Sequence, residues 1–347
     1  MIKRSYSIEL TTPAFLGGAD QRGEWRTPPF KALIREWWRI AVAPDVGFSV
    51  PQLKKRETEL FGTAADEGGG ENHRSLIRLA LKHWHAGNLR EHNPLPKIHH
   101  PEAEKAKHQV EPLSYLGYGP IDKGRFKNGA ALQDGDSNIL SIATPDIHVL
   151  QLSRGLTLIN WFGTIGGRSR NGWGSLVLKA GKDEPALPLL SPENLVESHC
   201  VRALVACLQD DWPHAIGSDE KGPLVWHSTE TFATWHDAMR FLAQVKIGFR
   251  VSLKLIGGQP HREPQARHVL AYPVTNHKVS PWEGPNRGRL ASTLRFKLAL
   301  GADARLVARI FHTPCRPTLP HNGIDLLGTW QTVHKHLDAH PQLTRLS

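Results

Sequence analysis

One segment, at residues 163–175, restricts the possible folds of this chain more than any other and reads Gly-Thr-Ile-Gly-Gly-Arg-Ser-Arg-Asn-Gly-Trp-Gly-Ser. Five of its first twelve residues are glycine. Because glycine has no Cβ, such a loop can adopt unusual backbone angles and lie close to a ligand. Arg168 and Arg170 alternate with polar residues, so both guanidinium groups can face one direction, and Trp173 can stack on a base. The segment therefore predicts a binding loop.

The setting of this loop excludes two kinds of nucleotide-binding loop. A helix is predicted at 152–162, directly before it, and a short strand at 175–178 after it. A P-loop needs Lys followed by Ser or Thr after its last glycine, and that pair does not follow here. The dinucleotide fingerprint follows a strand and opens a helix, which is the reverse order. A glycine turn packed against a sheet is the alternative, but such a turn rarely needs two arginines and a tryptophan.

A second cationic feature is a helix predicted at 27–42, which begins with Thr-Pro-Pro. At about 100° per residue, Lys31, Arg35 and Arg39 form one stripe on it. Trp38 lies at the boundary of this stripe, where it can stack on a base or edge the core. A solvated amphipathic helix would mix lysine with glutamate, and the one acid of this helix lies off the stripe. We favour phosphate binding. The opposite side carries Leu33, Ile34, Trp37, Ile40 and Ala41.

The charge balance favours an anionic partner. The chain has 347 residues, 39% of them apolar, and a net charge of +10 with a pI near 9.6. Residues 246–316 hold 13 Lys and Arg against 3 acids, an excess equal to that of the whole chain. Release of counterions makes such a stretch a natural surface for a nucleic-acid backbone. Charge kept for solubility is the alternative.

Helical and strand patterns are mixed along the chain, and the strands are short, so we predict an α+β protein. The length suits two domains, and a run rich in proline at 180–192 places the boundary, giving domains at 1–182 and 183–347. An irregular loop is expected at 63–72 and an exposed insertion at 83–108. Further strands are predicted at 5–15, 138–150, 249–256, 268–274, 292–300 and 304–312, and further helices at 52–60, 193–209, 231–247 and 324–339.

The chain is expected to be cytoplasmic and free of the membrane. No run approaches the roughly 18 apolar residues of a membrane span, and the first residues lack the apolar stretch of a signal peptide. Three cysteines, an odd and sparse count, argue against a disulfide framework and for a reducing compartment.

The helix and the loop together resemble a known family. A helix followed by a glycine-rich loop with basic residues and a Gly-aromatic-Gly ending is similar to the signature of the RAMP superfamily of CRISPR-associated proteins. The helix at 27–42, with its Trp37-Trp38-Arg39 sequence, resembles the opening motif of the first subunit of the type III-B Cmr complex. Other similar segments are Thr12-Pro13 with Gly17-Gly18-Ala19, Glu59-Leu60-Phe61-Gly62 and Arg289-Leu290-Ala291-Ser292.

The likeness covers residues 11–62, 152–178 and 267–300. The histidine-rich stretch at 83–108 and Thr293, where the family often has proline, depart from it. The role of the 83–108 insertion is therefore open.

The resemblance implies two ferredoxin-like, RRM-related domains with long loop insertions. It implies a non-catalytic subunit that caps the backbone of a crRNA-guided, RNA-targeting effector of antiviral defence, near the 3′ part of the guide. Its partners would be crRNA, target RNA and other RAMP subunits of a Cmr-like complex, with no cofactor and no metal. We expect the RNA contacts from Lys31, Arg35, Trp38, Arg39, Gly166, Gly167, Arg168, Arg170, Asn171, Gly172 and Trp173.

A metal-dependent endoribonuclease of the same superfamily is the alternative function. Asp134 and Asp136, in a Gln-Asp-Gly-Asp-Ser run, could hold a hard cation through oxygen ligands, although short Asp-Gly-Asp runs are usually turns. Other RAMP proteins use a general-base histidine. The candidates for it are His83, His85, His99 and His100, none with a partner fixed by spacing.

A zinc site is the weakest of the hypotheses. Cys200 and Cys207 are seven residues apart on the helix predicted at 193–209, so they share a face and suit a core. His199 and His214 lie near them in the sequence, but the spacing matches no standard zinc site.

Overall fold

A computed structural model describes residues 1–18, 20, 22–63, 74–104, 107–122, 125–126, 129–182, 184–284, 288–301 and 303–347. The fold is a mixed α+β fold with several antiparallel sheets, which confirms the predicted class. Apart from Thr63, the loop predicted at 63–72 falls outside the described residues. None of the helices in the described part of the chain is long and apolar enough to cross a membrane.

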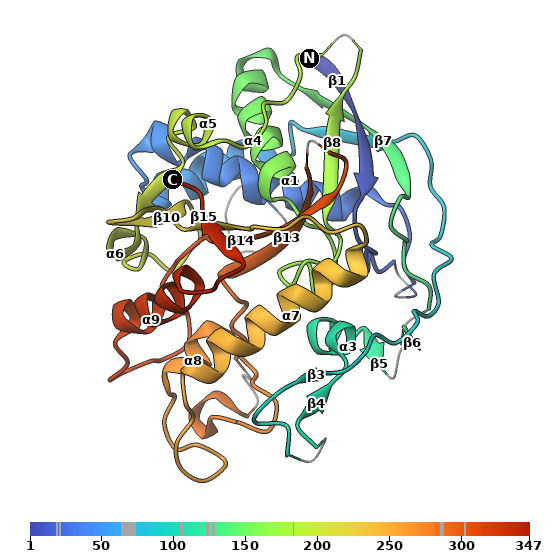
Figure 1. Cartoon of the computed structure of the whole chain (residues 1–347). Helices are drawn as coiled ribbons and strands as arrows, with labels where there is room; N and C mark the ends of the chain where they lie inside the picture. Colours follow the sequence, from blue (N-terminus) through green and yellow to red (C-terminus); the bar gives the residue numbers. More distant parts are fainter. Residues whose placement is uncertain are drawn as a thin grey trace.

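The first half of the chain forms one four-stranded sheet with helices on one face (Figure 1). Its main elements are β1 (Ile2–Leu10), α1 (Thr27–Val42), α2 (Val50–Phe61), β2 (Arg78–Leu81), β7 (Ser137–Thr144), α4 (Val149–Phe162) and β8 (Leu176–Ala180). The strands lie in the order β2-β7-β1-β8, and every neighbouring pair is antiparallel. α1 packs against α4.

Alternating burial explains why β1 is a strand with one covered face. Tyr6, Ile8 and Leu10 are buried, whereas Ser7 is exposed and Glu9 is half-buried. Successive side chains of a strand point to opposite faces, so the three apolar residues share the face that α1 and α4 cover. Ser7 and Glu9 share the opposite face, which meets solvent.

The second half repeats the same succession of strand, helix, two strands, helix and strand. Its main elements are β12 (Val225–Ser228), α7 (Trp235–Ser252), β13 (Leu294–Leu300), β14 (Leu306–His312), α9 (Leu326–Asp338) and β15 (Leu343–Arg345). The strand order β13-β14-β12-β15 is topologically the order of the first sheet. The prolines and glycines at 180–192 separate the two sheets, although one hydrophobic core cluster includes residues from both sides of that run.

The second sheet is covered on both faces, and this joins the halves. Phe296 and Leu298 of β13 belong to the core under α7, which lies in front of this sheet in Figure 1. The alternate residues Arg295 and Lys297 are equally buried and contact α1 and α4 of the first half. A strand buried on both faces reads as a continuous hydrophobic run; here basic side chains occupy one of the two faces.

Short elements complete the described fold. They are η1 (Ala43–Val46), β3 (Ile98–His99), β4 (Gln109–Val110), α3 (Pro112–Gly117), β5 (Ile121–Asp122), β6 (Arg125–Phe126), η3 (Asp146–His148), α5 (Pro192–Glu197), β9 (Val201–Ala203), α6 (Leu204–Cys207), β10 (Ile216–Asp219), β11 (Gly222–Pro223), α8 (Ala266–Leu270) and η4 (Ser280–Trp282). Much of the predicted insertion at 83–108 is exposed, as expected, and β3 is its short strand.

Four predicted elements are wrong in type or length. The strand predicted at 138–150 ends at Thr144, because Pro145 follows and the chain turns into η3 and α4. The strand predicted at 249–256 starts as the last turn of α7, which continues to Ser252. The strand predicted at 268–274 begins as the end of α8, whose capping box fixes a helical turn at Gln265, and its second part forms only isolated β-bridges at Tyr272 and Val274.

The helix predicted at 193–209 is also wrong, because it is broken into α5, β9 and α6. His199 between them has a φ of 53°, a left-handed conformation that ends a helix. Cys200 and Cys207 therefore do not lie on one helix. Both are buried, as expected for core residues, and burial raises the pKa of the Cys200 thiol to about 11.

Candidate nucleic-acid interface

The glycine-rich loop begins where α4 ends, and basic groups of the second half hold that end. The last carbonyls of a helix have no partner within the helix. Lys297 Nζ donates to the carbonyl oxygens of Ile159 at 3.0 Å and Asn160 at 2.7 Å, and Arg309 donates to that of Trp161. Basic side chains at a helix C-terminus also interact favourably with its dipole. The point where the loop leaves α4 is thus fixed by β13 and β14.

Burial changes the acid–base properties of these two basic groups. It lowers the pKa of Lys297 well below its usual value, an effect that the nearby Arg309 increases. Burial alone lowers the pKa of Arg309 to about 9. Both side chains are therefore committed to the fold and are not available to a ligand.

The second part of the loop joins the two sheets. Thr12 Oγ1 and Ser175 Oγ each donate to the carbonyl of Gly172 at 2.8 Å, and Ser175 Oγ accepts the Leu298 amide at 2.9 Å. Phe296 of β13 donates its amide to the Arg170 carbonyl at 3.1 Å. Gly174 has a φ of 64°, and a Cβ there would lie 1.9 Å from a backbone oxygen. This part of the loop therefore needs glycine for packing.

The tip of the loop is the part that faces solvent. Gly166, Gly167 and Arg168 are exposed, and Arg168 itself has a φ of 56°, a conformation that is uncommon for residues other than glycine. Partial desolvation of its guanidinium, and then the neighbouring charge of Arg289, lower the pKa of Arg168. No carboxylate among the described residues forms an ion pair with either arginine.

Two of the three glycine amides that we expected to bind phosphate are already used. The Gly167 amide donates to the Phe15 carbonyl at 3.0 Å, and the buried Gly172 amide donates to the Ser169 carbonyl at 3.1 Å. Neither amide is therefore a free donor for a phosphate in this structure. Gly166 at the exposed tip stays a candidate donor.

Arg170 and Asn171 lie between the tip and the clamped part. Arg170 Nη1 donates to the Ser292 carbonyl at 2.7 Å, and the residue is half-buried. Burial, and then Arg295, lower its pKa, whereas the carboxylate of Glu36 opposes them. Asn171 donates to the Leu116 carbonyl at 2.8 Å and accepts from Lys246 at 2.8 Å. Because both side chains bond other parts of the protein, they position the loop tip and add little to its exposed surface.

The predicted stripe on α1 exists, but an acid compensates most of it. Arg35 Nε lies 2.5 Å and Arg39 Nε 2.9 Å from the carboxylate of Glu57 on α2, which is 2% exposed. Arg39 also covers the ring of Trp212, 3.3 Å from its centroid. Lys31 is half-buried, and burial followed by the charge of Arg35 lowers its pKa. Of the three stripe residues, Lys31 and the partly exposed Arg35 can still reach a ligand.

Neither predicted stacking residue offers a ring to a base. Trp38 is 1% exposed and meets Phe61 edge to face, with the ring centroids 5.5 Å apart. Trp173 is 0% exposed and lies 5.0 Å from the ring of Phe15. Both belong to the hydrophobic core, so the expectation of base stacking by these two residues is wrong.

The structure adds basic residues that the sequence identified only as part of a charged stretch. Lys246 and Arg250 are four residues apart on α7 and lie on one face. Lys246 bonds the loop through Asn171, and burial, then Arg250 and Arg168, lower its pKa well below the usual value. In the sequence, the spacing of four residues between Lys246 and Arg250 was the signal that could have identified this pair. With Arg168 and Arg289 they form the basic cluster, which we define by these four residues.

Among the residues of the alternative functions, His100 lies near this cluster: its ring is 5.6 Å from that of Tyr115, and Lys246 Nζ lies 5.5 Å from the centroid of the same Tyr115 ring. The other residues named for these functions have no contact with the cluster that the structure gives for its described residues. The carboxylate of Asp136 accepts the Gln133 amide at 3.0 Å, which is a turn contact. The rings of His99 and His108 lie 6.1 Å apart in the exposed insertion. In the ranges that the structure describes, no three His, Cys, Asp or Glu residues are grouped to hold a metal ion.

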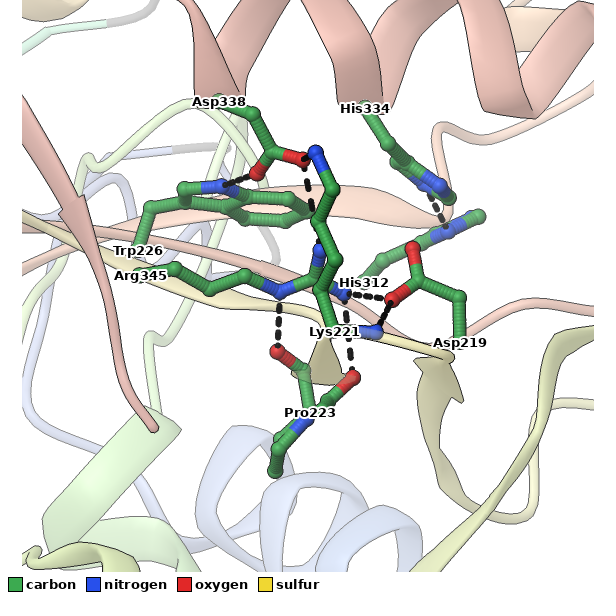
Figure 2. A network of polar contacts seen from close by, with 9 residues as sticks. Asp219, Lys221, Pro223, Trp226, His312, His334, Asp338 and Arg345 are labelled. Atoms are coloured by element: carbon green, nitrogen blue, oxygen red, sulfur yellow. Dashed lines mark hydrogen bonds and ion pairs between the residues drawn. The ribbon is translucent and has the colours of Figure 1, made fainter.

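A separate polar network ties the C-terminal strand to the second half (Figure 2). Arg345 donates to Asp219 at 2.6 Å and to the Pro223 carbonyl at 2.9 Å. Asp338 accepts from Trp226 Nε1 at 2.8 Å and from Lys221 at 3.0 Å. These charges pair with one another, so the network stabilises β15 and leaves the loop as the interface candidate.

Fold and interface together define the class of the molecule: an α+β protein whose glycine-rich loop is clamped between the two four-stranded sheets and carries a basic tip. No family model matches the chain. Over 90 residues, which are 26% of this chain and 46% of the relative, it is 27% identical to the CRISPR system Cmr subunit Cmr1-2 of Pyrococcus furiosus. The match therefore spans less than half the length of that curated relative.

One solved structure extends the likeness over the whole chain. The crystal structure of apo Cmr1 from Pyrococcus furiosus matches with a TM-score of 0.51 and 14% identity, covering 100% of this chain and 99% of that one. A subunit of a type III-B Cmr-beta complex bound to cognate target RNA and AMPPnP matches with a TM-score of 0.49 and 10% identity over 96% of this chain. The first of these likenesses shows that the chain has the fold of Cmr1.

Proposed function

We propose that this chain is a non-catalytic, RNA-binding subunit of a Cmr-like, type III-B CRISPR effector complex. The fold of Cmr1 and the local similarity to a Cmr1 subunit support the family. The observation that carries RNA binding is the exposed loop tip, where Arg168 lies beside Arg289 without an acidic partner among the described residues. A guanidinium group in that setting suits a phosphodiester oxygen.

Each half of the chain is inferred to be a ferredoxin-like domain, with bounds at 1–182 and 183–347. The support is the repeated succession of strand, helix, two strands, helix and strand, with equivalent spatial order in both sheets. The loop tip leaves the first domain, and the basic residues around it come from both.

The proposed RNA contacts are to the phosphate backbone. They come from Arg168 and Arg289 of the basic cluster and from Gly166, with Lys31 and Arg35 of α1 as an extension. Since base pairing with the guide supplies the sequence in such complexes, these contacts need no base specificity. The partners would be crRNA, target RNA and neighbouring RAMP subunits in the cytoplasm, with the chain near the 3′ part of the guide.

RNA binding is tested by titrating the purified chain into labelled single-stranded RNA at several salt concentrations. The proposal predicts that the logarithm of the affinity falls linearly with the logarithm of the salt concentration. Failure to bind at low salt would contradict it.

The second candidate is a metal-dependent endoribonuclease with Asp134 and Asp136 as the acidic residues. The turn contact of Asp136 with the Gln133 amide favours a structural role instead. Incubation of the chain with RNA and magnesium or manganese separates the two functions. Our proposal predicts intact RNA, whereas cleavage that disappears in Asp136→Ala would establish the nuclease.

A further inference from the structure

A pocket lies directly beside the exposed loop tip. Its volume is about 310 Å³, which is large enough for a small ligand. Phe15 and Phe126 provide its aromatic surface, Pro120 and Gly167 lie on the side of the loop, and the other lining residues that the structure describes are glycine and alanine. These glycine and alanine residues present mainly peptide backbone, and the pocket is open beside the tip.

The aromatic floor is held by the core beneath it. The rings of Phe15 and Phe126 meet edge to face with centroids 5.3 Å apart, and Phe15 lies 5.0 Å from the buried ring of Trp173. Phe15 itself is half-buried. Trp173 thus has a clear role: it supports from below a ring that part of the pocket exposes.

The guanidinium group of Arg168 lies at the rim of this pocket. A Cβ placed on Gly119 would lie 3.2 Å from Arg168 Nη2, so the guanidinium lies over Gly119, next to the lining residue Pro120. Tyr118, one residue earlier, is 64% exposed. The pocket therefore has an aromatic interior with the positive charge of Arg168 at its mouth. The carboxylate of Glu24 lies on another side, against the lining residue Gly18, where a Cβ would meet Glu24 Oε1.

We propose that this pocket binds one unstacked base of a single-stranded RNA, with Arg168 on the adjoining phosphate. Every base has a π-face that can lie against an aromatic ring, and its phosphate carries a negative charge that the guanidinium of Arg168 can bind. The proposal rests on the RNA-binding function above and adds to it a base-binding site. Trp38 and Trp173, which the sequence suggested for stacking, are replaced by the half-buried Phe15, with the 8% exposed ring of Phe126 beside it.

Gly167 allows the pocket to be filled without disturbing the loop. Its φ lies outside the left-handed region, and a Cβ there would lie 3.4 Å from Phe15 Cβ and 3.8 Å from Pro120 Cγ, both ordinary contacts. Gly167→Leu therefore places a side chain in the space of the base. Gly258→Leu is the matched control, because Gly258 has the same freedom and open space around it.

The test compares a twelve-nucleotide RNA with an oligomer of the same length that has the sugar–phosphate backbone and no bases. We expect the chain to bind the RNA about ten-fold more tightly than the abasic oligomer, as one stacked base would give. In Gly167→Leu this preference should fall to about one, with unchanged affinity for the abasic oligomer. Gly258→Leu should keep the preference, and circular dichroism should show that both variants are folded.

Two outcomes would overturn the inference in different ways. Equal affinity of the unaltered chain for both oligomers, or a preference that survives in Gly167→Leu, would remove the pocket and leave the phosphate contacts standing. If neither oligomer binds at low salt, the RNA-binding function itself fails, and the pocket fails with it.

Phe15→Leu, which removes the ring and keeps an apolar side chain, should lose most of the preference for RNA over the abasic oligomer.

Discussion

Basic side chains of this protein have two different uses, and burial separates them. Arg295, Lys297 and Arg309 are buried and bond acceptors in α1 or α4. Arg168, by contrast, is exposed at a loop tip, beside the exposed Arg289. The excess of positive charge at 246–316 is thus partly internal scaffolding, which the sequence alone does not distinguish from a binding surface.

The pH dependence of stability should reveal one of the buried contacts. Burial, and then Arg309, lower the pKa of His227 from 6.5 to about 3. Below pH 6.5 the unfolded chain therefore takes up a proton on His227 that the folded chain does not. The contribution of His227 to the free energy of unfolding is fully present above pH 6.5 and is lost as the pH falls. His227→Gln, which can still accept from Arg309, should remove up to about 2 kcal/mol of the decline between pH 7 and pH 5.

Urea unfolding at the two pH values measures this effect. His83→Gln is the control, since His83 is exposed. An identical decline in His227→Gln and in the unaltered chain would show that His227 does not control it.

The two arginines of the α1 stripe should behave differently. The side chain of Arg39 is 13% exposed and that of Arg35 is 42% exposed, although both bond Glu57. Arg39→Ala should therefore cost about 2 kcal/mol of unfolding free energy or more, because it leaves a buried carboxylate short of a donor. Arg35→Ala should cost about 0–1 kcal/mol and reduce the salt dependence of RNA binding. Thermal unfolding and salt titrations distinguish them; an unchanged salt dependence in Arg35→Ala would limit the stripe to structure.

At the scale of elements, local signals succeeded where they were strong. Two prolines and a regular apolar face predicted α1 correctly over Thr27–Val42. The helix predicted at 193–209 failed because the left-handed turn at His199 depends on packing that no local pattern records. The glycines identified the loop between α4 and β8 in the sequence. Which of them pack against the sheets and which are exposed could not be predicted from the sequence.

The hydrogen bonds from the second sheet to the end of α4 should contribute to the stability of the fold. Lys297→Met keeps the length of the side chain and removes its hydrogen bonds to two carbonyls at the end of α4. The Ile159 carbonyl still accepts the Gly163 amide, whereas the Asn160 carbonyl loses the lysine donor. We expect the unfolding free energy to fall by about 2 kcal/mol, the usual contribution of a hydrogen bond to a charged group. Denaturant unfolding checks it against Lys179→Met, a surface pair with Glu9 that should cost less than about 1 kcal/mol. An unchanged denaturant midpoint of unfolding in Lys297→Met would mean that the two hydrogen bonds do not stabilise the contact between the second sheet and α4.

At the scale of the whole molecule, long-range pairing limited what the sequence could predict. The α+β class and the importance of the glycine-rich loop followed from composition and pattern. The compensation of Arg35 by Glu57 links residues 22 apart, and the bond from Lys297 to Ile159 links residues 138 apart. Such contacts exist only once the two sheets lie together, so the burial of Trp38 and the compensated stripe required the structure.

The fold of Cmr1 and the basic loop tip meet in one claim, that the tip binds the RNA backbone. Arg168 is the residue to change, because Arg170 also bonds Ser292 and its removal would disturb the fold. Arg56 is an exposed arginine on α2 and serves as the control.

The most direct measurement is the affinity of each variant for single-stranded RNA as a function of salt. Arg168→Ala should bind more weakly, with a slope of log affinity against log salt that is shallower by about 0.7 for each phosphate that the variant no longer neutralises. Arg56→Ala should match the unaltered chain. Equal affinity and equal slope in Arg168→Ala and the unaltered chain would contradict the account.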